Sequence, residues 1–149
     1  MQALILVGGE ATRLRPLTCN MPKAMVPVLN TPFLEHYIRY LGSHGVNDIV
    51  LAQGRLPEMM DNYFQDGSRF NARLTYSLES WPMNTAGAIK NAEGFLTGRF
   101  FAMNGDIFTD LDLTGMLKFH LEKKAQVTIA LTPVEDPTAY GLIETDSHG

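Results

Sequence analysis

A short apolar run that ends in paired glycines and then enters a proline-rich loop constrains this chain more than any other feature. Residues 3–7 read Ala-Leu-Ile-Leu-Val, and Gly8 and Gly9 follow directly. The prolines of the next stretch are Pro16, Pro22, Pro27 and Pro32. They interrupt every window in which a long helix could grow, while apolar side chains between them favour an ordered loop over disorder. The sequence therefore predicts a first strand that opens into a long, anchored loop.

The composition of this loop indicates that it handles phosphate. Because glycine has no Cβ, Gly8 and Gly9 allow backbone N–H groups to approach a ligand closely. Three cations follow, namely Arg13, Arg15 and Lys23. The P-loop pattern G-x-x-x-x-G-K-[ST] is absent, and the dinucleotide pattern G-x-G-x-x-G fails at its second and third glycines. The loop thus supports neither a P-loop ATPase nor a dinucleotide dehydrogenase.

Apolar periodicity along the chain predicts alternating strands and helices, the pattern of an α/β sandwich around a mainly parallel sheet. The expected strands cover residues 3–7, 46–52, 72–78, 99–103 and 127–131. The expected helices cover residues 33–41, 57–64, 85–96 and 113–121. No internal repeat or domain linker interrupts this order, so we treat residues 1–149 as one portion of a domain.

Polar residues follow two of the expected strands where each strand ends. Gly8 and Gly9 end one strand, and Asn104, Gly105 and Asp106 end another. In open α/β sheets ligands bind outside the carboxyl ends of the strands, so both motifs should open onto one edge. A carboxylate among phosphates is repelled unless a cation lies between them, and we therefore expect Asp106 to bind Mg²⁺. An ordinary turn role for Asp106 stays open at this point.

Several ordered motifs resemble those of the sugar-phosphate nucleotidyltransferases, also called nucleotide-sugar pyrophosphorylases. The first two are Gly8-Gly9-x-x-Thr12-Arg13-Leu14-x-Pro16-Leu17-Thr18 and Pro22-Lys23-x-Met25-Val26-Pro27-Val28. The later ones are Thr85-Ala86-Gly87-Ala88, Asn104-Gly105-Asp106 and Tyr140-Gly141. The chain is most similar to the mannose-1-phosphate guanylyltransferase branch and its uridylyl and thymidylyl relatives. The resemblance implies a Rossmann-like three-layer sandwich that transfers a nucleotidyl group from a nucleoside triphosphate to a sugar 1-phosphate, with release of pyrophosphate.

The resemblance also implies roles for individual side chains. Catalytic roles fall to Arg13 on the leaving β- and γ-phosphates, to Lys23 near the α-phosphate, and to Asp106 as the ligand of Mg²⁺. The expected nucleotide-binding residues are Leu6, Gly8, Gly9, Thr12, Arg13, Lys23, Glu79, Asn84 and Thr85. The sugar would contact Asn104 and Gly141. Thr12 has an alternative role as a local turn cap.

Glu79 bears on which base is bound, because its position in the resembled family lies beside the base. A carboxylate only accepts hydrogen bonds, and guanine offers adjacent N1–H and N2–H donors. Uracil and thymine instead offer an imide edge that glutamine matches. Glu79 therefore favours GTP, with an exposed glutamate at a strand end as the alternative. Trp81 and Met83 are candidates for the wall of the base pocket or for the core.

The chain departs from the family pattern at two loop positions. Ala11 replaces a frequent glycine, which adds a methyl group and should remove a conformation with positive φ. Asn84 stands where a glycine usually precedes Thr85, and asparagine tolerates left-handed geometry best after glycine. We expect both substitutions to be adjustments that preserve function.

The chain stops at Gly149, before the Glu-Lys-Pro region and second metal-binding aspartate of the family. We therefore expect residues 1–149 to form the N-terminal nucleotide-binding portion of a nucleotidyltransferase domain, with a sheet that is incomplete at the C-terminus. Such a chain should bind nucleoside triphosphate with Mg²⁺, lack transfer activity and form a homo-oligomer through an unpaired sheet edge. A non-catalytic regulatory homologue that binds a nucleotide sugar is the rival interpretation.

Composition excludes several partner classes. A formal net charge of -4 argues against nucleic acid as a partner. No run approaches the roughly 20 apolar residues that a membrane span needs, which argues against a membrane partner. One cysteine, Cys19, excludes an internal disulfide and fits a reducing compartment, and no secretory leader is visible. The sequence therefore predicts a cytoplasmic location.

Overall fold

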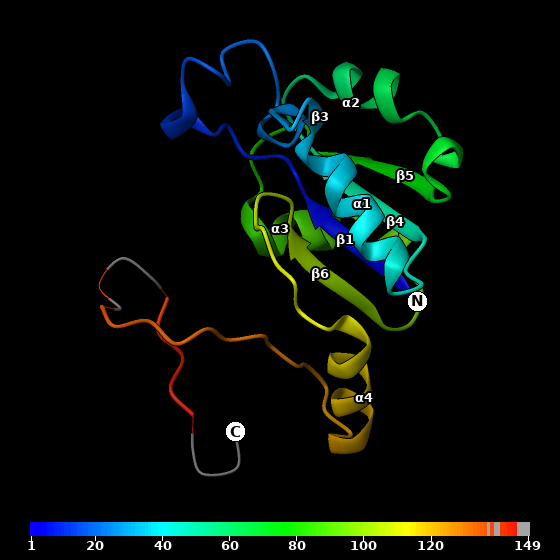
Figure 1. The fold of residues 1–149 in the computed structure, drawn as a ribbon, viewed down its shortest axis with the longest axis vertical. Helices are drawn as coiled ribbons and strands as arrows, with labels where there is room; N and C mark the ends of the chain where they lie inside the picture. The colour runs from blue at the N-terminus through cyan, green and yellow to red at the C-terminus, as the bar shows by residue number, and fades with distance from the viewer. Residues whose placement is uncertain (137, 139–140, 146–149) are drawn as a thin grey trace. The chain divides into compact units, whose positions relative to one another are not determined.

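The computed structural model describes residues 1–136, 138 and 141–145. The chain divides into two compact units, Met1–Leu111 and Asp112–Gly149. The first unit contains the parallel sheet and its covering helices, and the second contains one helix and a long irregular segment (Figure 1).

Within the described residues, the first unit is built on a four-stranded sheet (Figure 1). Its strands in spatial order are β5 (Arg73–Leu78), β4 (Asp48–Gln53), β1 (Gln2–Leu6) and β6 (Phe100–Asn104). All neighbouring pairs are parallel, and Leu4 of β1 pairs with Val50 of β4 and with Ala102 of β6. The continuous apolar runs within β1 (residues 3–6) and β4 (residues 49–52) suit a parallel sheet, because helices cover both of its faces. The mainly parallel sheet predicted from the sequence is confirmed.

Helices lie on opposite faces of this sheet and complete three layers, as predicted. The helix α1 (Phe33–Ser43) covers one face and α3 (Asn84–Asn91) covers the other (Figure 1). The helix α2 (Pro57–Phe64) is joined to α1 by a hydrogen bond of 2.8 Å from the Tyr63 hydroxyl to Glu35 Oε2. The short strands β2 (Pro27–Val28) and β3 (Thr31–Pro32) form an antiparallel pair just before α1.

Glu35 is a nearly buried carboxylate at the contact between α1 and α2. Besides the Tyr63 hydroxyl, it accepts hydrogen bonds from Arg39 Nε at 3.0 Å and Arg39 Nη2 at 2.7 Å. Burial opposes ionisation of Glu35, but these hydrogen bonds outweigh it and lower the pKa of Glu35 below its ordinary value. The charged form of Glu35 therefore stabilises the packing of α2 on α1.

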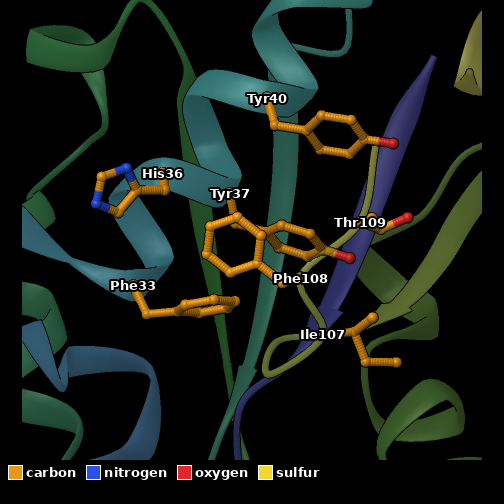
Figure 2. A pocket seen from close by; sticks show the side chains of 7 residues that line it. All are labelled: Phe33, His36, Tyr37, Tyr40, Ile107, Phe108 and Thr109. Carbon is orange, nitrogen blue, oxygen red and sulfur yellow. The ribbon is translucent and has the colours of Figure 1, made fainter. Parts of the chain in front are cut away.

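Aromatic side chains of α1 support the turn that follows β6. Figure 2 shows them around a small hollow of about 40 Å³, which is lined by Phe33, His36, Tyr37, Tyr40, Ile107, Phe108 and Thr109. The Phe33 and Phe108 rings meet edge to face with centroids 5.5 Å apart, and the Tyr40 hydroxyl donates to the Leu111 carbonyl oxygen. Burial raises the pKa of Tyr37 to about 12, and nearby Tyr40 and Asp106 add to the rise. The residues that follow Asp106 thus pack against aromatic side chains of α1.

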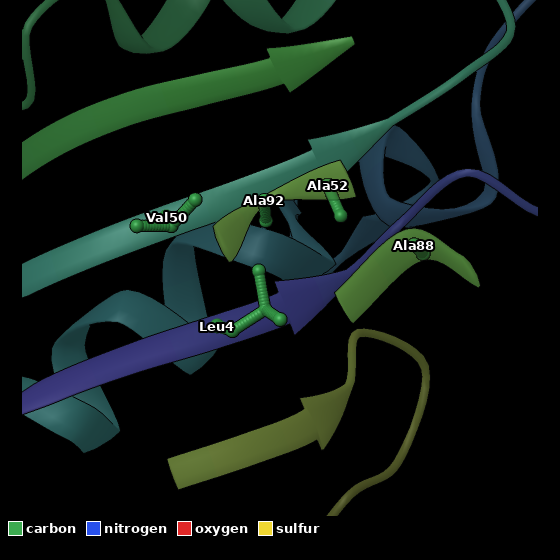
Figure 3. Close-up of a cluster of buried hydrophobic side chains, with 5 residues drawn as sticks. All are labelled: Leu4, Val50, Ala52, Ala88 and Ala92. Carbon is green, nitrogen blue, oxygen red and sulfur yellow. The ribbon is translucent and has the colours of Figure 1, made fainter. Parts of the chain in front are cut away.

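Small residues allow α3 to pack closely on the other face of the sheet. Leu4, Val50 and Ala52 from the sheet meet Ala88 of α3 and Ala92, which follows it (Figure 3). All are fully or almost fully buried. Because alanine side chains are small, α3 can approach the sheet closely. This packing fixes the start of α3 near the carboxyl end of β1.

Several short elements differ from the sequence-based expectation. The helix expected over residues 85–96 is split, since α3 ends at Asn91 and a 3₁₀ turn, η4 (Glu93–Phe95), follows it. Asn91 Nδ2 donates to Ser77 Oγ and to the Leu78 carbonyl oxygen, which ties the end of α3 to β5. The other 3₁₀ turns are η1 (Thr12–Leu14), η2 (Lys23–Met25) and η3 (Ser68–Phe70).

The second unit contains α4 (Leu113–Lys123), as predicted, but the strand expected over residues 127–131 is wrong. These residues have no regular secondary structure, and Val127 and Ile129 are 74% and 63% exposed. A strand needs a partner for its backbone groups, and none of the described residues pairs with this segment. Tyr140 lies outside the described residues, as do residues 146–149. Among the described helices, none is long and apolar enough to cross a membrane.

Candidate functional site

A cavity of about 500 Å³ opens at the carboxyl ends of β1 and β6. The chain runs from β1 outward to β4 and β5 and then returns to β6 on the other side of β1. The order of strands therefore reverses between β1 and β6, which is where open α/β sheets hold their ligands. Of the predicted site residues, those that line the cavity are Leu6, Gly8, Gly9, Lys23, Glu79, Asn84, Thr85, Asn104 and Asp106.

Gly8 and Glu79 are in close contact at one wall of the cavity. A Cβ built at Gly8 would lie 2.5 Å from Glu79 Oε1, so no larger residue fits there unless the carboxylate moves. Glu79 is fixed by two hydrogen bonds, one from its backbone N to the Gln53 carbonyl oxygen at 2.8 Å and one from Met83 N to its Oε2 at 3.2 Å. The glycine therefore makes room for a carboxylate that faces the cavity, where it can accept hydrogen bonds from a ligand.

Lys23 and Asp106 form an ion pair across the cavity. Lys23 begins η2 in the long loop, and Asp106 lies in the turn after β6. Lys23 Nζ and Asp106 Oδ2 are 2.5 Å apart, and their side chains are 37% and 41% exposed. Gly105 N donates to the Leu6 carbonyl oxygen at 2.9 Å, which extends the pairing of β1 and β6 up to the turn. A cation and a carboxylate predicted to act together are thus in direct contact.

The start of α3 forms another wall. Asn84 has φ 56°, so asparagine does adopt the left-handed conformation expected at this position. A Cβ at Gly87 would lie 2.8 Å from Met83 Cβ, which shows how tightly the chain turns into the helix. Backbone N–H groups at a helix start attract anions. Asn84 and Thr85, both exposed, are therefore placed to meet a charged ligand.

Arg13, the arginine of the first motif, lies outside the residues that line the cavity. Of the predicted residues that lie in the first unit, Thr12 and Arg13 do not line the cavity. Thr12 and Arg13 are exposed on η1, and Gly141 is part of the second unit. The expectation that Ala11 removes the conformation with positive φ is wrong, because Ala11 itself adopts φ 48° and ψ 43°. This conformation costs a residue with a Cβ about 1–2 kcal/mol.

Comparisons with known proteins show the family to which this chain belongs. A family model described as nucleotidyl transferase matches residues 2–149. The chain belongs to the nucleotidyl transferase family. It is 37% identical over 147 residues to a mannose-1-phosphate guanylyltransferase of Mycobacterium tuberculosis, covering 98% of this chain and 41% of that protein. It is 41% identical over 147 residues to a mannose-1-phosphate guanyltransferase of Hypocrea jecorina, covering 96% of this chain and 40% of that protein.

Solved structures show the same family fold. The crystal structure of HddC from Yersinia pseudotuberculosis complexed with GMP-PN matches with a TM-score of 0.73 and 30% identity, covering 81% of this chain and 54% of that chain. A UDP-glucose pyrophosphorylase complexed with UDP-glucose matches with a TM-score of 0.69 and 18% identity, covering 83% and 54%, which shows the fold alone. This nucleotidyl transferase chain spans about 40% of the length of the curated relatives described above.

One carboxylate in the cavity of this nucleotidyl transferase chain, that of Asp106, could contribute a ligand to a metal ion. Among the described residues, no group of three or more His, Cys, Asp and Glu side chains could hold a metal by itself. Asp106 faces the cavity as a single carboxylate beside Lys23. Mg²⁺ commonly binds one or two carboxylates together with the phosphates of a substrate and water. Asp106 could therefore supply one ligand, and the remaining ligands of such an ion would come from elsewhere.

The cavity of this family member is also lined by residues to which the sequence assigned no role in the site. They are Val7, Glu10, Ala11, Ala24, Pro82, Ala88 and Gly105. Met83, a candidate wall residue, does line the cavity, whereas Trp81 is not among the lining residues described and is 66% exposed. Most of the missed residues are next to predicted ones, so extending each motif by one residue would have found them.

Proposed function

We propose that the cavity binds a nucleoside triphosphate, with GTP favoured, and serves the transfer of its nucleotidyl group to a sugar 1-phosphate. The observation that carries this proposal is the meeting of the glycine loop, Lys23 and Asp106 at one cavity. The guanylyltransferase relatives support GTP and a mannose-like sugar phosphate as the substrates. Because those relatives extend well beyond the matched region, this chain would supply the nucleotide side of the site.

The base would lie against the wall formed by Gly8 and Glu79. Glu79 Oε2 is held by Met83 N, and Oε1 is turned towards Gly8 at the cavity surface. A carboxylate in this place matches the N1–H and N2–H donors of guanine, whereas the N3–H of uracil or thymine lies between two carbonyl groups that a carboxylate would repel. This arrangement favours GTP over UTP and dTTP.

The phosphates would lie between Lys23, Asp106 and the start of α3. In the proposed reaction an oxygen of the sugar 1-phosphate attacks the α-phosphate in line, and the bond to the leaving pyrophosphate breaks. Lys23 would stabilise the negative charge that develops on the transferring phosphate. Mg²⁺, when bound, would supply positive charge between the phosphates and Asp106. Asn104, at the end of β6, is placed to contact the sugar.

Arg13 has a predicted role on the leaving phosphates, and this role requires movement. It lies on the exposed turn η1, outside the residues that line the cavity. We therefore propose that η1 approaches the phosphates when the nucleotide binds. A cytoplasmic location and self-association stay predictions of the sequence.

A binding experiment tests the proposal directly. Calorimetric titration with Mg²⁺–GTP, Mg²⁺–UTP and Mg²⁺–dTTP should show GTP as the tightest ligand. Lys23→Ala should weaken GTP binding about tenfold or more, the effect of losing a hydrogen bond to a charged group. Lys90→Ala is the matched control, because Lys90 is an exposed lysine on the far part of α3 paired with Glu93. Equal affinity of the two variants would contradict the proposed site.

A further inference from the structure

The segment from Ala11 to Thr18 is closed on itself by a buried hydroxyl group. Thr18 is fully buried, and its Oγ1 donates a hydrogen bond of 2.8 Å to the Ala11 carbonyl oxygen. Leu14 N donates to the same carbonyl oxygen at 3.1 Å. The two ends of the segment that carries Arg13 are therefore tied together at Ala11.

Arg55 holds the outgoing end of this segment from a distant part of the chain. It lies in the connection between β4 and α2. Its Nη2 donates to the Cys19 carbonyl oxygen at 2.7 Å, and its Nη1 donates to the Thr18 carbonyl oxygen at 3.3 Å. The planar guanidinium can reach two adjacent carbonyl groups at once, which a lysine cannot do in the same geometry.

The same connection also touches the incoming end of the loop. A Cβ at Gly54, the residue before Arg55, would lie 3.0 Å from the Gly8 carbonyl oxygen. Gly54 and Arg55 thus contact the loop at Gly8, where it leaves β1, and at Thr18 and Cys19, where it returns. The connection after β4 acts as a brace across the base of the loop.

The brace affects the cavity through Ala11. Ala11 and Glu10 line the cavity, and Ala11 has the left-handed backbone conformation that alanine rarely adopts. A strained residue persists only where its surroundings determine it, and here Thr18 holds its carbonyl group. The position of this cavity wall therefore depends on hydrogen bonds that start at Arg55.

We infer that Arg55 and Thr18 are positioning residues of the nucleotide site, which set the cavity wall made by Glu10 and Ala11 beside the phosphates of the ligand. The inference rests on the proposed function. Loss of either side chain should loosen the wall made by Glu10 and Ala11. The effect should fall on the phosphate tail, because the base faces Glu79, which the Gln53 carbonyl oxygen and Met83 N hold independently.

The test compares GTP with GMP, since only GTP carries the longer phosphate tail. Calorimetry should show that Arg55→Ala and Thr18→Val weaken Mg²⁺–GTP binding about tenfold. GMP binding should change less than about twofold, because a single phosphate makes fewer contacts with the loop. Thr18→Ser, which keeps the hydroxyl, should bind GTP as tightly as wild type does. Arg55→Lys should bind GTP more tightly than Arg55→Ala but less tightly than wild type. Arg99→Ala is the control for the loss of an exposed arginine.

The outcomes separate this inference from the proposed function. A wild-type chain that binds neither nucleotide overturns the proposed function and the inference with it. If wild type binds GTP and the variants keep its ratio of GTP to GMP affinity, the inference alone is overturned, even where the melting temperature falls. Trypsin supplies a second measurement, because the Arg13-Leu14 bond within the segment is a cleavage site for this protease. Arg55→Lys, the milder change, should already speed cleavage there, and an unchanged rate would count against the brace.

Discussion

Asp106→Asn is expected to strengthen the binding of metal-free GTP while it weakens the binding of Mg²⁺–GTP. In the structure the Asp106 carboxylate forms an ion pair with the Lys23 ammonium group. A phosphate must therefore displace the carboxylate before Lys23 can bind the ligand. Asparagine has nearly the same shape but no charge, and it leaves the lysine free. When Mg²⁺ is present the carboxylate has a cation of its own, and its removal takes away a metal contact.

The size of the effect follows from the exposure of the pair. Lys23 and Asp106 are 37% and 41% exposed, so solvent screens their attraction. Exposed ion pairs contribute up to about 1 kcal/mol, which corresponds to about a fivefold gain in affinity for metal-free GTP. Raising the ionic strength should reduce this gain, because salt screens exposed charges.

Calorimetry with GTP in EDTA and with GTP in excess Mg²⁺ measures both directions. Asp110→Asn is the matched control, because Asp110 is an exposed carboxylate in the same turn region. We expect Asp106→Asn to change affinity with opposite sign in the two buffers and Asp110→Asn to change it little in either. Weaker binding of metal-free GTP by Asp106→Asn, or an equal gain in Asp110→Asn, would refute the reasoning.

Three further changes test other parts of the account. Gly8→Ala should displace the Glu79 carboxylate and lower GTP affinity, whereas Gly94→Ala, where a Cβ has nothing within 4 Å and which lies on η4 outside the cavity lining, is its control; equal affinities would remove the steric argument. Glu79→Gln should narrow the preference for GTP over UTP by about 1–3 kcal/mol, the cost of a mismatched buried donor or acceptor, and titrations with no response would take Glu79 out of the base site. The lowered pKa of Glu35 stabilises the fold fully above the unfolded pKa of about 4.3, and this contribution is lost as the pH falls through the lower folded value. Urea unfolding should therefore show a steeper loss of stability below pH 4 in wild type than in Glu35→Gln, and parallel curves would contradict the assignment.

The central strands of the sheet, β1 and β4, could be predicted from the sequence because they are buried on both faces. Residues 3–7 and 49–52 are continuously apolar, which is typical of central parallel strands. The segment 127–131 has similar composition but no regular structure, since strand formation depends on a pairing partner that local sequence does not specify. The split after Asn91 was also missed, because it depends on hydrogen bonds to β5.

The meeting of Lys23 and Asp106 could be predicted because their motifs follow neighbouring strands. Lys23 lies in the loop after β1, and Asp106 lies in the turn after β6. Topology brings such residues together whatever the details of the side chains. The conformation of Ala11 was predicted wrongly, because contacts from Thr18 override the local preference of alanine. Arg55 carries no motif at all. Its contacts with the carbonyl groups of Thr18 and Cys19 depend on the folded path of the loop, which the sequence does not specify.

The most direct test of the central claim is a titration of the ¹⁵N-labelled chain with Mg²⁺–GTP, followed by the backbone amide signals. If the cavity is the nucleotide site, the amides of Gly8, Gly9 and Gly105 should shift together and saturate at one ligand. The amides of Ser68–Phe70, which lie on η3 outside the residues that line the cavity, should stay in place. Saturable shifts confined to η3, or no saturable shifts at the glycines, would contradict the claim that this cavity binds the nucleotide.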